Sequence, residues 1–357
     1  MKSRSAFTLL CCLLWMTLAH AATAPAPHDG QHDFDFEIGT WKIHLKKMLH
    51  PLTGSSDWVE FDGSTYTQKV LDGRANLEQF ETNGSAGQIE GMTLRLYNPA
   101  SHQWSIYWAT SKTGTLSIPT VGEFKNGVGE FYDHEPINGR MVFVRYIWSR
   151  ITPNSAHFEQ AFSDDGGKTW EVNWITDETR VSEEEFKTLS ESTTPKMESA
   201  SAGDNQHDFD FETGTWTAHL KRRLHPLSGS DTWVDLDGTS VVKKIWNGRA
   251  NFGELEVGNA DTHIEGLTLR LYNPQSHQWR LYWANSKDGA LNVPTIGNFS
   301  NGRGDFFDQE DFGDKSIFVR FVFSDVTPNS FQTEQAFSPD FGKTWEPNWI
   351  GTFTKKN

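Results

Sequence analysis

The sequence predicts an all-β protein with two tandem up-and-down antiparallel β-barrels, each of about eight to ten strands. Three observations support this fold class. A block of about 150 residues, the size of one ordinary domain, occurs twice. Turn residues interrupt each block at short, even intervals. The stretches between the turns alternate between apolar or aromatic and polar side chains.

The duplication keeps one register throughout. The segment HDFDFE begins at His32 and again at His207, and the offset of 175 residues continues without a gap to the C-terminus. Two copies are too few for a solenoid, so each copy must close around its own core. We therefore expect barrel domains over 30–180 and 207–357. A flexible linker over 181–206 joins them, with one short helix at 182–189.

Short turns separate the expected strands. Dipeptides that favour tight turns recur through the first repeat: Asp62-Gly63, Asp72-Gly73, Asn83-Gly84, Asn98-Pro99, Asn126-Gly127 and Asn138-Gly139. A meander of this many strands most simply closes on itself, because closure removes the exposed strand edges. A barrel of this size has room for one small ligand.

The N-terminal 21 residues have the pattern of a signal peptide. Lys2 and Arg4 precede an apolar run over 7–18, and Ala19-His20-Ala21 offers a cleavage site for signal peptidase. The apolar run is too short to span a bilayer, and no later segment is long enough. We therefore expect a periplasmic or secreted protein without membrane insertion after cleavage.

Composition excludes several kinds of site. Both cysteines, Cys11 and Cys12, lie in the signal segment, so the mature chain has no disulfide, no reactive thiol and no cysteine metal ligand. The net charge of −15 disfavours a nucleic-acid partner. The sequence has no P-loop, no dinucleotide fingerprint and no metal-binding histidine spacing, so we expect neither a cofactor nor a metal.

Each repeat opens with a G-x-W motif, Gly39-Thr40-Trp41 and Gly214-Thr215-Trp216, after a short aromatic lead-in. This motif resembles the first-strand signature of the calycins, the group that contains the lipocalins and fatty-acid-binding proteins. The resemblance implies that each tryptophan packs across the closed end of its barrel. It also implies that a basic residue near the end of the last strand, Arg180 or Lys355, covers that tryptophan.

The repeats also resemble a bacterial family of lipocalin-like proteins whose activity is mostly unassigned. The matching segments are Leu94–Pro99, Tyr107–Ala109 and Glu159–Ser163. The resemblance covers nearly all of both repeats and implies a lipocalin-like barrel with a small-molecule ligand. In nitrobindin-like relatives haem requires a late-strand histidine. His157 becomes Gln332 in the second copy, so haem is not expected.

One strand of each repeat carries two tryptophans on the same face. Trp104 and Trp108 share their face in the first repeat, and Trp279 and Trp283 share theirs in the second. The opposite face carries Ser105 or Arg280, which indicates solvent, so we expect the tryptophans to point inward. Two interpretations remain open: a packed core, or the wall of a pocket for an apolar, aromatic or sugar ligand.

Arg95 and Arg270 lie in otherwise apolar strands. Strict alternation places Arg95 opposite Leu94 and Leu96, which allows an exposed side chain. The alternatives are a buried Arg–Glu pair or an arginine that binds a ligand carboxylate or phosphate. We take Arg95, Trp104, Trp108, Arg270, Trp279 and Trp283 as candidate ligand-binding residues.

An enzymatic alternative rests on polar residues that both copies keep. Lipocalin-like barrels include isomerases, cyclases and lyases, so these side chains are candidates for proton transfer. They are His44, Tyr107, Arg145 and Glu159, with their counterparts His219, Tyr282, Arg320 and Glu334. This hypothesis requires the four side chains of one repeat to converge. A third alternative is an envelope interaction module whose barrels are packed solid.

One further turn motif occurs in both repeats. The pattern S-x-D-x-G-x-T-W starts at Ser163 and again at Ser338, and it resembles the Asp-box hairpin of sialidase-like propellers. Asp accepts backbone N–H groups in such a turn, and Gly permits a positive φ. We expect a structural role for this turn.

Overall fold

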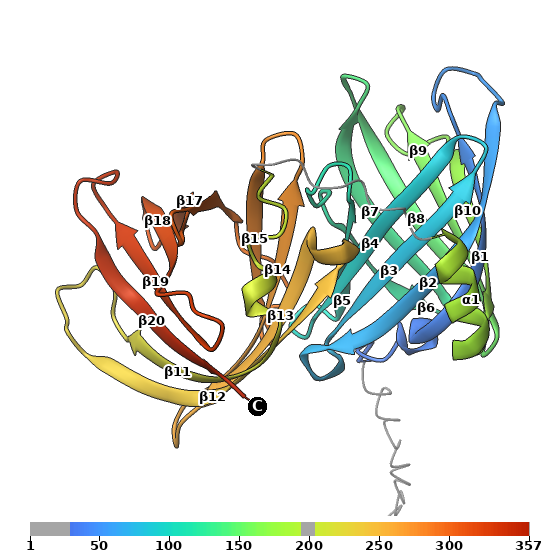
Figure 1. Ribbon diagram of the computed structural model, residues 1–357. Helices are drawn as coiled ribbons and strands as arrows, with labels where there is room; N and C mark the ends of the chain where they lie inside the picture. The colour runs from blue at the N-terminus through green and yellow to red at the C-terminus, as the bar shows by residue number, and fades with distance from the viewer. Residues whose placement is uncertain (1–28, 194–203, 357) are drawn as a thin grey trace, which may run out of the picture.

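The computed structural model describes residues 29–193 and 204–356, which form two closed antiparallel β-barrels of ten strands each (Figure 1). The all-β fold class is confirmed, and the strand number lies at the upper end of the expected range. The predicted signal segment at 1–21 lies outside the described residues. Within them, no helix has the length and apolar character needed to cross a bilayer.

Barrel 1 is an uninterrupted meander that closes between its first and last strands. Its strands are β1 (Gly39–Met48), β2 (Trp58–Val70), β3 (Ala75–Gly84), β4 (Gly87–Asn98), β5 (Gln103–Thr110), β6 (Thr120–Lys125), β7 (Val128–Ile137), β8 (Arg140–Thr152), β9 (Ser155–Ser163) and β10 (Glu171–Arg180). The barrel closes where β1 pairs with β10, with Trp41 opposite Arg180. Short 3-10 turns, η1 (Asp35–Glu37) and η2 (Leu71–Gly73), precede β1 and β3.

Barrel 2 repeats this arrangement. Its strands are β11 (Gly214–Arg223), β12 (Trp233–Ile245), β13 (Ala250–Gly258), β14 (His263–Asn273), β15 (Gln278–Asn285), β16 (Thr295–Ser300), β17 (Arg303–Phe312), β18 (Lys315–Ser324), β19 (Ser330–Ser338) and β20 (Glu346–Lys355). The turns η3 (Asp210–Glu212) and η4 (Trp246–Gly248) correspond to η1 and η2. Between the barrels, helix α1 (Glu183–Thr193) follows β10 and packs Phe186 against Tyr66 on the outside of barrel 1.

The G-x-W tryptophans seal one end of each barrel, as the calycin resemblance implies. Trp41 is fully buried and donates its indole N–H to the Glu37 carbonyl at 2.8 Å. The Arg180 guanidinium lies 4.1 Å from the Trp41 ring centre and donates to the carbonyls of the chain that crosses this end. Lys355 takes the same place over Trp216, at 5.2 Å. This closed end fixes the floor of each interior.

The two barrels pack against each other through the outer faces of β3–β5 and β13–β15, which lie side by side in Figure 1. The buried apolar residues of this contact include Leu94 and Leu96 from barrel 1 with Leu269 and Leu271 from barrel 2. This contact explains why apolar side chains occupy an outer face. It also means that the opposite face of β4, which carries Arg95, points into the barrel.

The contact between the barrels is close to isologous: several bonds have a counterpart with the repeats exchanged. The bond from the Trp246 indole N–H to the Gly91 carbonyl has none, because Leu71 stands at the equivalent position. Arg74 donates to Glu265 at 3.0 Å, and its equivalent Arg249 donates to Glu90 at 2.6 Å. The Tyr282 hydroxyl accepts from the backbone N–H of Leu116 at 3.3 Å. The hydroxyl of the equivalent tyrosine, Tyr107, likewise accepts a hydrogen bond from the Leu291 backbone. Reciprocal contacts of this kind characterise a two-fold interface.

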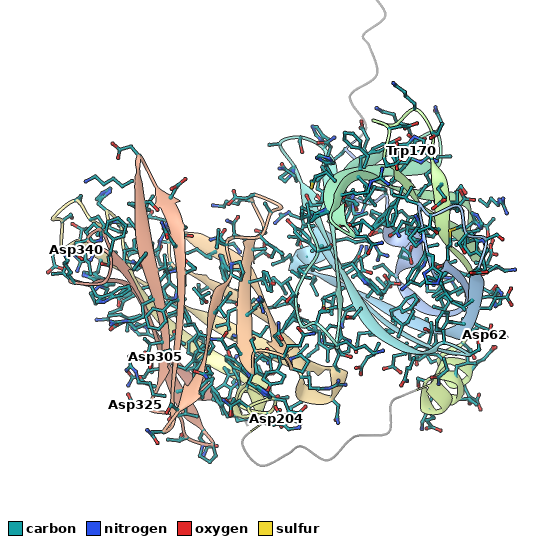
Figure 2. The ribbon with its side chains drawn as sticks, turned by 90° about the horizontal axis from the view of Figure 1, so that it is seen from above. Asp62, Trp170, Asp204, Asp305, Asp325 and Asp340 are labelled. Carbon is teal, nitrogen blue, oxygen red and sulfur yellow. The ribbon has the colours of Figure 1, made fainter. Side chains whose placement is uncertain are left out.

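The predicted structural turns are present in both barrels. Asp165 accepts the backbone N–H groups of Lys168 and Thr169, each at 3.0 Å, and the Ser163 hydroxyl at 2.8 Å. These donors lower the pKa of Asp165 to about 2, the backbone N–H of Thr169 contributing most. Asp340 makes the corresponding bonds at the outer edge of barrel 2 (Figure 2).

Candidate ligand cavities

Barrel 2 contains a cavity of about 510 Å³. Aromatic and apolar side chains, among them Leu281, Trp283, Phe321, Phe323 and Trp349, line it together with many polar and charged ones. A volume of this size is typical of small-molecule sites, which span roughly 300–1,000 Å³. The cavity lies above the sealed end of the barrel and extends toward Arg222, near the other end of β11.

Barrel 1 has the same frame but a cavity of only about 80 Å³. The two interiors differ at several equivalent positions, and at three of them barrel 1 carries the bulkier side chain. Phe158 stands where barrel 2 has Thr333, and Thr176 where it has Gly351. Glu78 occupies the position of barrel 1 that is equivalent to Gly253 in barrel 2. Barrel 1 is therefore largely filled by its own side chains, which departs from the expectation of a comparable ligand in each barrel.

The floor of the barrel 2 cavity is an ion pair. Arg270 donates to Glu212 at 2.9 Å and to the Asn251 side chain at 2.8 Å, and both charged residues are buried. The guanidinium also lies 5.1 Å from the Phe209 ring centre. Burial raises the pKa of Glu212, although Arg270 opposes this shift. The two charges of the floor balance each other.

The floor of barrel 1 carries more carboxyl groups. Arg95 donates to Glu78 at 2.8 Å and to the Asn76 side chain at 3.1 Å, and it lies 3.8 Å from Glu37. Glu178 faces the same interior from β10. Burial raises the pKa of Glu37 to about 7, even though Arg95 lowers it. Burial also raises the pKa of Glu178, and the carboxylates of Glu37 and Glu78 add to the effect.

A second pair of carboxyl groups lies higher in each barrel, on β7 and β17. Burial, with a smaller contribution from Glu310, raises the pKa of Asp308 to about 7, and both residues line the barrel 2 cavity. In barrel 1 burial and Glu135 raise the pKa of Asp133 in the same way, to about 7. The interiors of both barrels therefore hold more acidic than basic groups.

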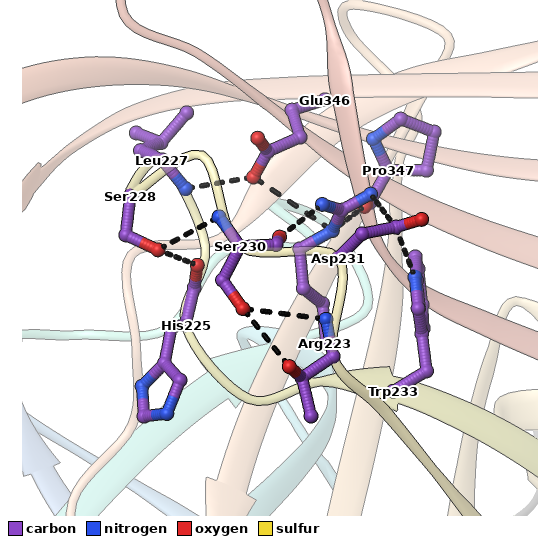
Figure 3. Close-up of polar contacts among 10 residues, drawn as sticks. Arg223, His225, Leu227, Ser228, Ser230, Asp231, Trp233, Glu346 and Pro347 are labelled. Atoms are coloured by element: carbon purple, nitrogen blue, oxygen red, sulfur yellow. Dashed lines mark hydrogen bonds and ion pairs between the residues drawn. The ribbon is translucent and has the colours of Figure 1, made fainter.

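A polar cluster fixes the rim of barrel 2 next to Arg222 (Figure 3). Arg223 donates to the carbonyls of Pro347 at 3.0 Å and Ser230 at 2.6 Å, and its guanidinium lies 4.8 Å from the Trp233 ring centre. Barrel 1 has Met48 at the position of Arg223. In both barrels a glutamate of the last strand, Glu171 or Glu346, accepts a backbone N–H of this turn. Arg223 adds a further tie between the β11–β12 turn and β20 in barrel 2 alone, beside the open end of the larger cavity.

The candidate ligand-binding residues divide into two groups. Trp108 and Trp283 line the cavities, and so do Arg95 and Arg270. Trp104 and Trp279 instead pack against Phe34 and Phe209 in the sealed ends, where their indole N–H groups bond to backbone carbonyls. For these two tryptophans the packed-core interpretation fits. Arg95 and Arg270 are buried in ion pairs, so of the three interpretations left open the buried Arg–Glu pair fits and the exposed side chain does not.

The four candidate catalytic residues of each repeat do not converge. His44 is part-exposed on the outside of β1, 2.9 Å from Asp62, which Figure 2 places at the outer edge of barrel 1. Tyr107 lies in the contact between the barrels. Arg145 covers the outer Trp170, and Glu159 bonds to His157. In barrel 2, His219 bonds to Asp237, Tyr282 lies in the contact between the barrels, and Arg320 bonds to Glu334.

This dispersion has a geometric cause. His44, Tyr107, Arg145 and Glu159 all point outward from their strands, so the barrel wall separates them from the cavity. The inward-facing acids Glu37, Glu78 and Glu178 were not among the sequence-based candidates. One signal could have drawn attention to two of them: Glu78 and Glu178 differ between the copies, as Gly253 and Phe353.

No protein-family model matches the sequence, and no curated protein matches it. Among solved structures it is similar to an S-type phycobiliprotein lyase from Guillardia theta, with 12% identity over 43% of this chain and 92% of that chain, and a TM-score of 0.32. A de novo designed fluorescence-activating β-barrel matches at 14% identity over 41% of this chain and 95% of that chain, with a TM-score of 0.24.

A third match covers both repeats. A DUF3598-family protein of unknown function from Nostoc punctiforme has 9% identity over 92% of this chain and 99% of that chain, with a TM-score of 0.23. At such identities and TM-scores, the matches say nothing about ligand or activity.

Proposed function

We propose that this protein binds a small, predominantly apolar and aromatic ligand inside barrel 2. The observation that carries the proposal is the cavity of about 510 Å³, set against about 80 Å³ in the equivalent barrel. Trp283, Phe321 and Trp349 offer aromatic faces to a flat ligand, and burial of such a ligand supplies the binding energy.

The charges favour a ligand without a negative group in the deep part of the cavity. Glu212 already neutralises Arg270, so this arginine does not offer a free positive charge to a carboxylate. Asp308 and Glu310 add negative charge to the lining when they ionise. A neutral ring system with one or two hydroxyl or carbonyl groups fits this lining better than a fatty acid does.

Barrel 1 supports the wall of this site. Arg74 and Leu116 of barrel 1 bond to Glu265 and Tyr282, two residues at the edge of the barrel 2 cavity. Barrel 1 therefore holds β14 and β15 in place without enclosing a large ligand itself. The open interior of barrel 2 favours binding of this ligand there, whereas the interior of barrel 1 is too small for it.

The proposal is tested by a binding screen on the full chain. Native mass spectrometry and tryptophan quenching against neutral phenolics, glycans and fatty acids should detect binding in the phenolic class. The double variant Thr333→Phe/Gly351→Thr installs the barrel 1 side chains in barrel 2 and should weaken binding at least tenfold. His219→Ala, on the outer wall, is the matched control and should bind normally. Absence of binding in every class would overturn the proposal.

We also propose that the chain is exported. The support is the basic, apolar and A-x-A pattern over residues 1–21 and the lack of cysteine after Cys12. Expression with fractionation, followed by N-terminal sequencing, should recover a protein that begins at Ala22 outside the cytoplasm. An intact Met1 terminus in the cytoplasmic fraction would contradict export.

A further inference from the structure

The small cavity of barrel 1 is enclosed by aromatic rings. Six rings line it, from Phe80, Trp108, Tyr146, Trp148, Phe158 and Trp174. Three of them form a mutual cluster: Phe80 lies 5.4 Å from Trp108 and 6.3 Å from Trp174, and the two indoles are 6.2 Å apart between centroids. The negative faces of such rings form the walls that proteins use to hold organic cations.

Carboxyl groups form the other side of the same cavity. Glu78 and Glu178 both line it, and Glu37 lies directly beneath; each of the three is at most 6% exposed. One oxygen of Glu37 and one of Glu178, Oε2 in each, accept no hydrogen bond from the described residues. A buried carboxylate oxygen without a donor is costly, so these atoms require a proton or a positive group.

The charges of this interior do not balance. Three carboxyl groups surround one buried guanidinium, that of Arg95, which already donates to Glu78 and lies near Glu37. In barrel 2 the positions of Glu78 and Glu178 hold Gly253 and Phe353, and one acid faces one arginine. The excess of acid at the floor is therefore specific to the barrel with the small aromatic cavity.

We propose that barrel 1 binds a small organic cation of the methylated-ammonium class in this cavity, held by the aromatic rings and by the carboxylates of Glu78 and Glu178. The volume of about 80 Å³ suits a single ammonium head group and excludes the larger ligand proposed for barrel 2. The two sites are separate, and neither proposal depends on the other.

Protons compete with this cation. Burial holds the pKa of Glu178 well above its usual range, and that of Glu37 at about 7. The other charged groups that face them are Arg95, Glu78 and Arg180, and the Lys47 ammonium lies 5.2 Å from the Trp174 ring centre. Binding of an ammonium ion must release a proton from these acids, so affinity should increase as the pH rises from 6 to 8.

The test is calorimetric titration of the full chain with tetramethylammonium chloride at pH 6 and pH 8. We expect saturable binding that is several-fold tighter at pH 8. Glu178→Gln and Glu78→Gln keep the side-chain shape and should each weaken binding about tenfold or more. The matched control Glu159→Gln, on the outer face of β9 in the same barrel, should leave affinity unchanged.

Three results would overturn the proposal: no binding at either pH, affinity that is the same in Glu178→Gln and Glu78→Gln, or loss of binding in the barrel 2 variant Thr333→Phe. Should the glutamine variants fail to fold, Trp174→Leu removes one ring from a part-exposed position and must weaken binding as well. Because Thr333→Phe acts on the proposed aromatic ligand alone, failure of one site is distinguishable from failure of the other.

Discussion

Barrel 1 and barrel 2 have the same strand order and the same sealed end, and their sequences align with a constant offset of 175 residues. Even so, one interior is nearly full and the other is open. The difference comes from a few inward-facing positions, chiefly Phe158 against Thr333 and Glu78 against Gly253. The frame remains the same because the strand ladders, the G-x-W floor and the turns do not depend on those side chains. A duplicated barrel can thus change its ligand by substitution inside an unchanged wall.

The floors of the two barrels also differ in their balance of charges. In barrel 2 one arginine and one glutamate balance each other, whereas in barrel 1 two further glutamates replace a glycine and a phenylalanine. The same arginine therefore has different partners in the two copies. Variants at equivalent positions of the two barrels test this difference.

Removal of the floor arginine should be the most damaging change. Arg270→Leu leaves Glu212 buried without its partner and should cost about 3–5 kcal/mol at neutral pH. The loss should shrink as the pH falls, because a protonated Glu212 needs no counter-charge. Urea denaturation at pH 7 and pH 5 measures both effects. Equal losses at the two pH values would show that the packing of Arg270, not its charge, matters.

Exchanging the side chains at one pair of equivalent interior positions should affect the stability of the two barrels differently. Phe158→Thr empties space in barrel 1 and should cost about 3 kcal/mol. The reverse change, Thr333→Phe, enters an existing cavity and should alter stability by less than about 1 kcal/mol. Equilibrium unfolding of the two variants gives the comparison. A large loss from Thr333→Phe would mean that barrel 2 is less open than its cavity indicates.

Two equivalent glycines at the contact between the barrels test its symmetry. A Cβ at Gly114 would lie 1.8 Å from the Tyr272 carbonyl oxygen, and one at Gly289 would lie 2.1 Å from that of Tyr97. Both glycines also have positive φ. Gly114→Ala and Gly289→Ala should each cost about 2 kcal/mol in thermal or urea unfolding. Strongly unequal costs would argue against an isologous contact.

The additional acids of barrel 1 should make the stability of the protein depend on pH near neutrality. The folded-state pKa of Glu37 is about 7, above its ordinary value of 4.5, so the folded protein binds the proton more tightly. Stability from this group is complete below pH 4.5 and is lost as the pH rises through 7, by about 1 kcal/mol per pH unit in between. Glu37→Gln should flatten that part of the curve, which thermal unfolding across the pH range measures.

The outward-facing candidates should have the smallest effect. His44→Ala and His219→Ala remove part-exposed side chains that pair only with surface acids, so each should change stability by less than about 0.5 kcal/mol. Ligand binding in either barrel should be unaffected. A clear loss of binding in His44→Ala would restore the enzymatic hypothesis that placed this histidine in a pocket.

The amino-acid sequence predicted the all-β class, the two closed units and the inward face of Trp108 and Trp283, and the resemblance of its G-x-W motif to the calycins implied the sealed ends. These features depend on local patterns: period-two alternation, turn dipeptides, and a motif at the start of each repeat. Each can be recognised in a short stretch because backbone geometry sets it.

The tertiary structure decided the rest. Leu94 and Arg95 alternate in the sequence, but which of them faces the interior depended on a second barrel that covers the outer wall. The acids of the barrel 1 floor come from η1, β3 and β10, so no local pattern could reveal that they meet. Cavity volume likewise depends on the sum of side chains from many strands, and only their arrangement around the closed barrel fixes it.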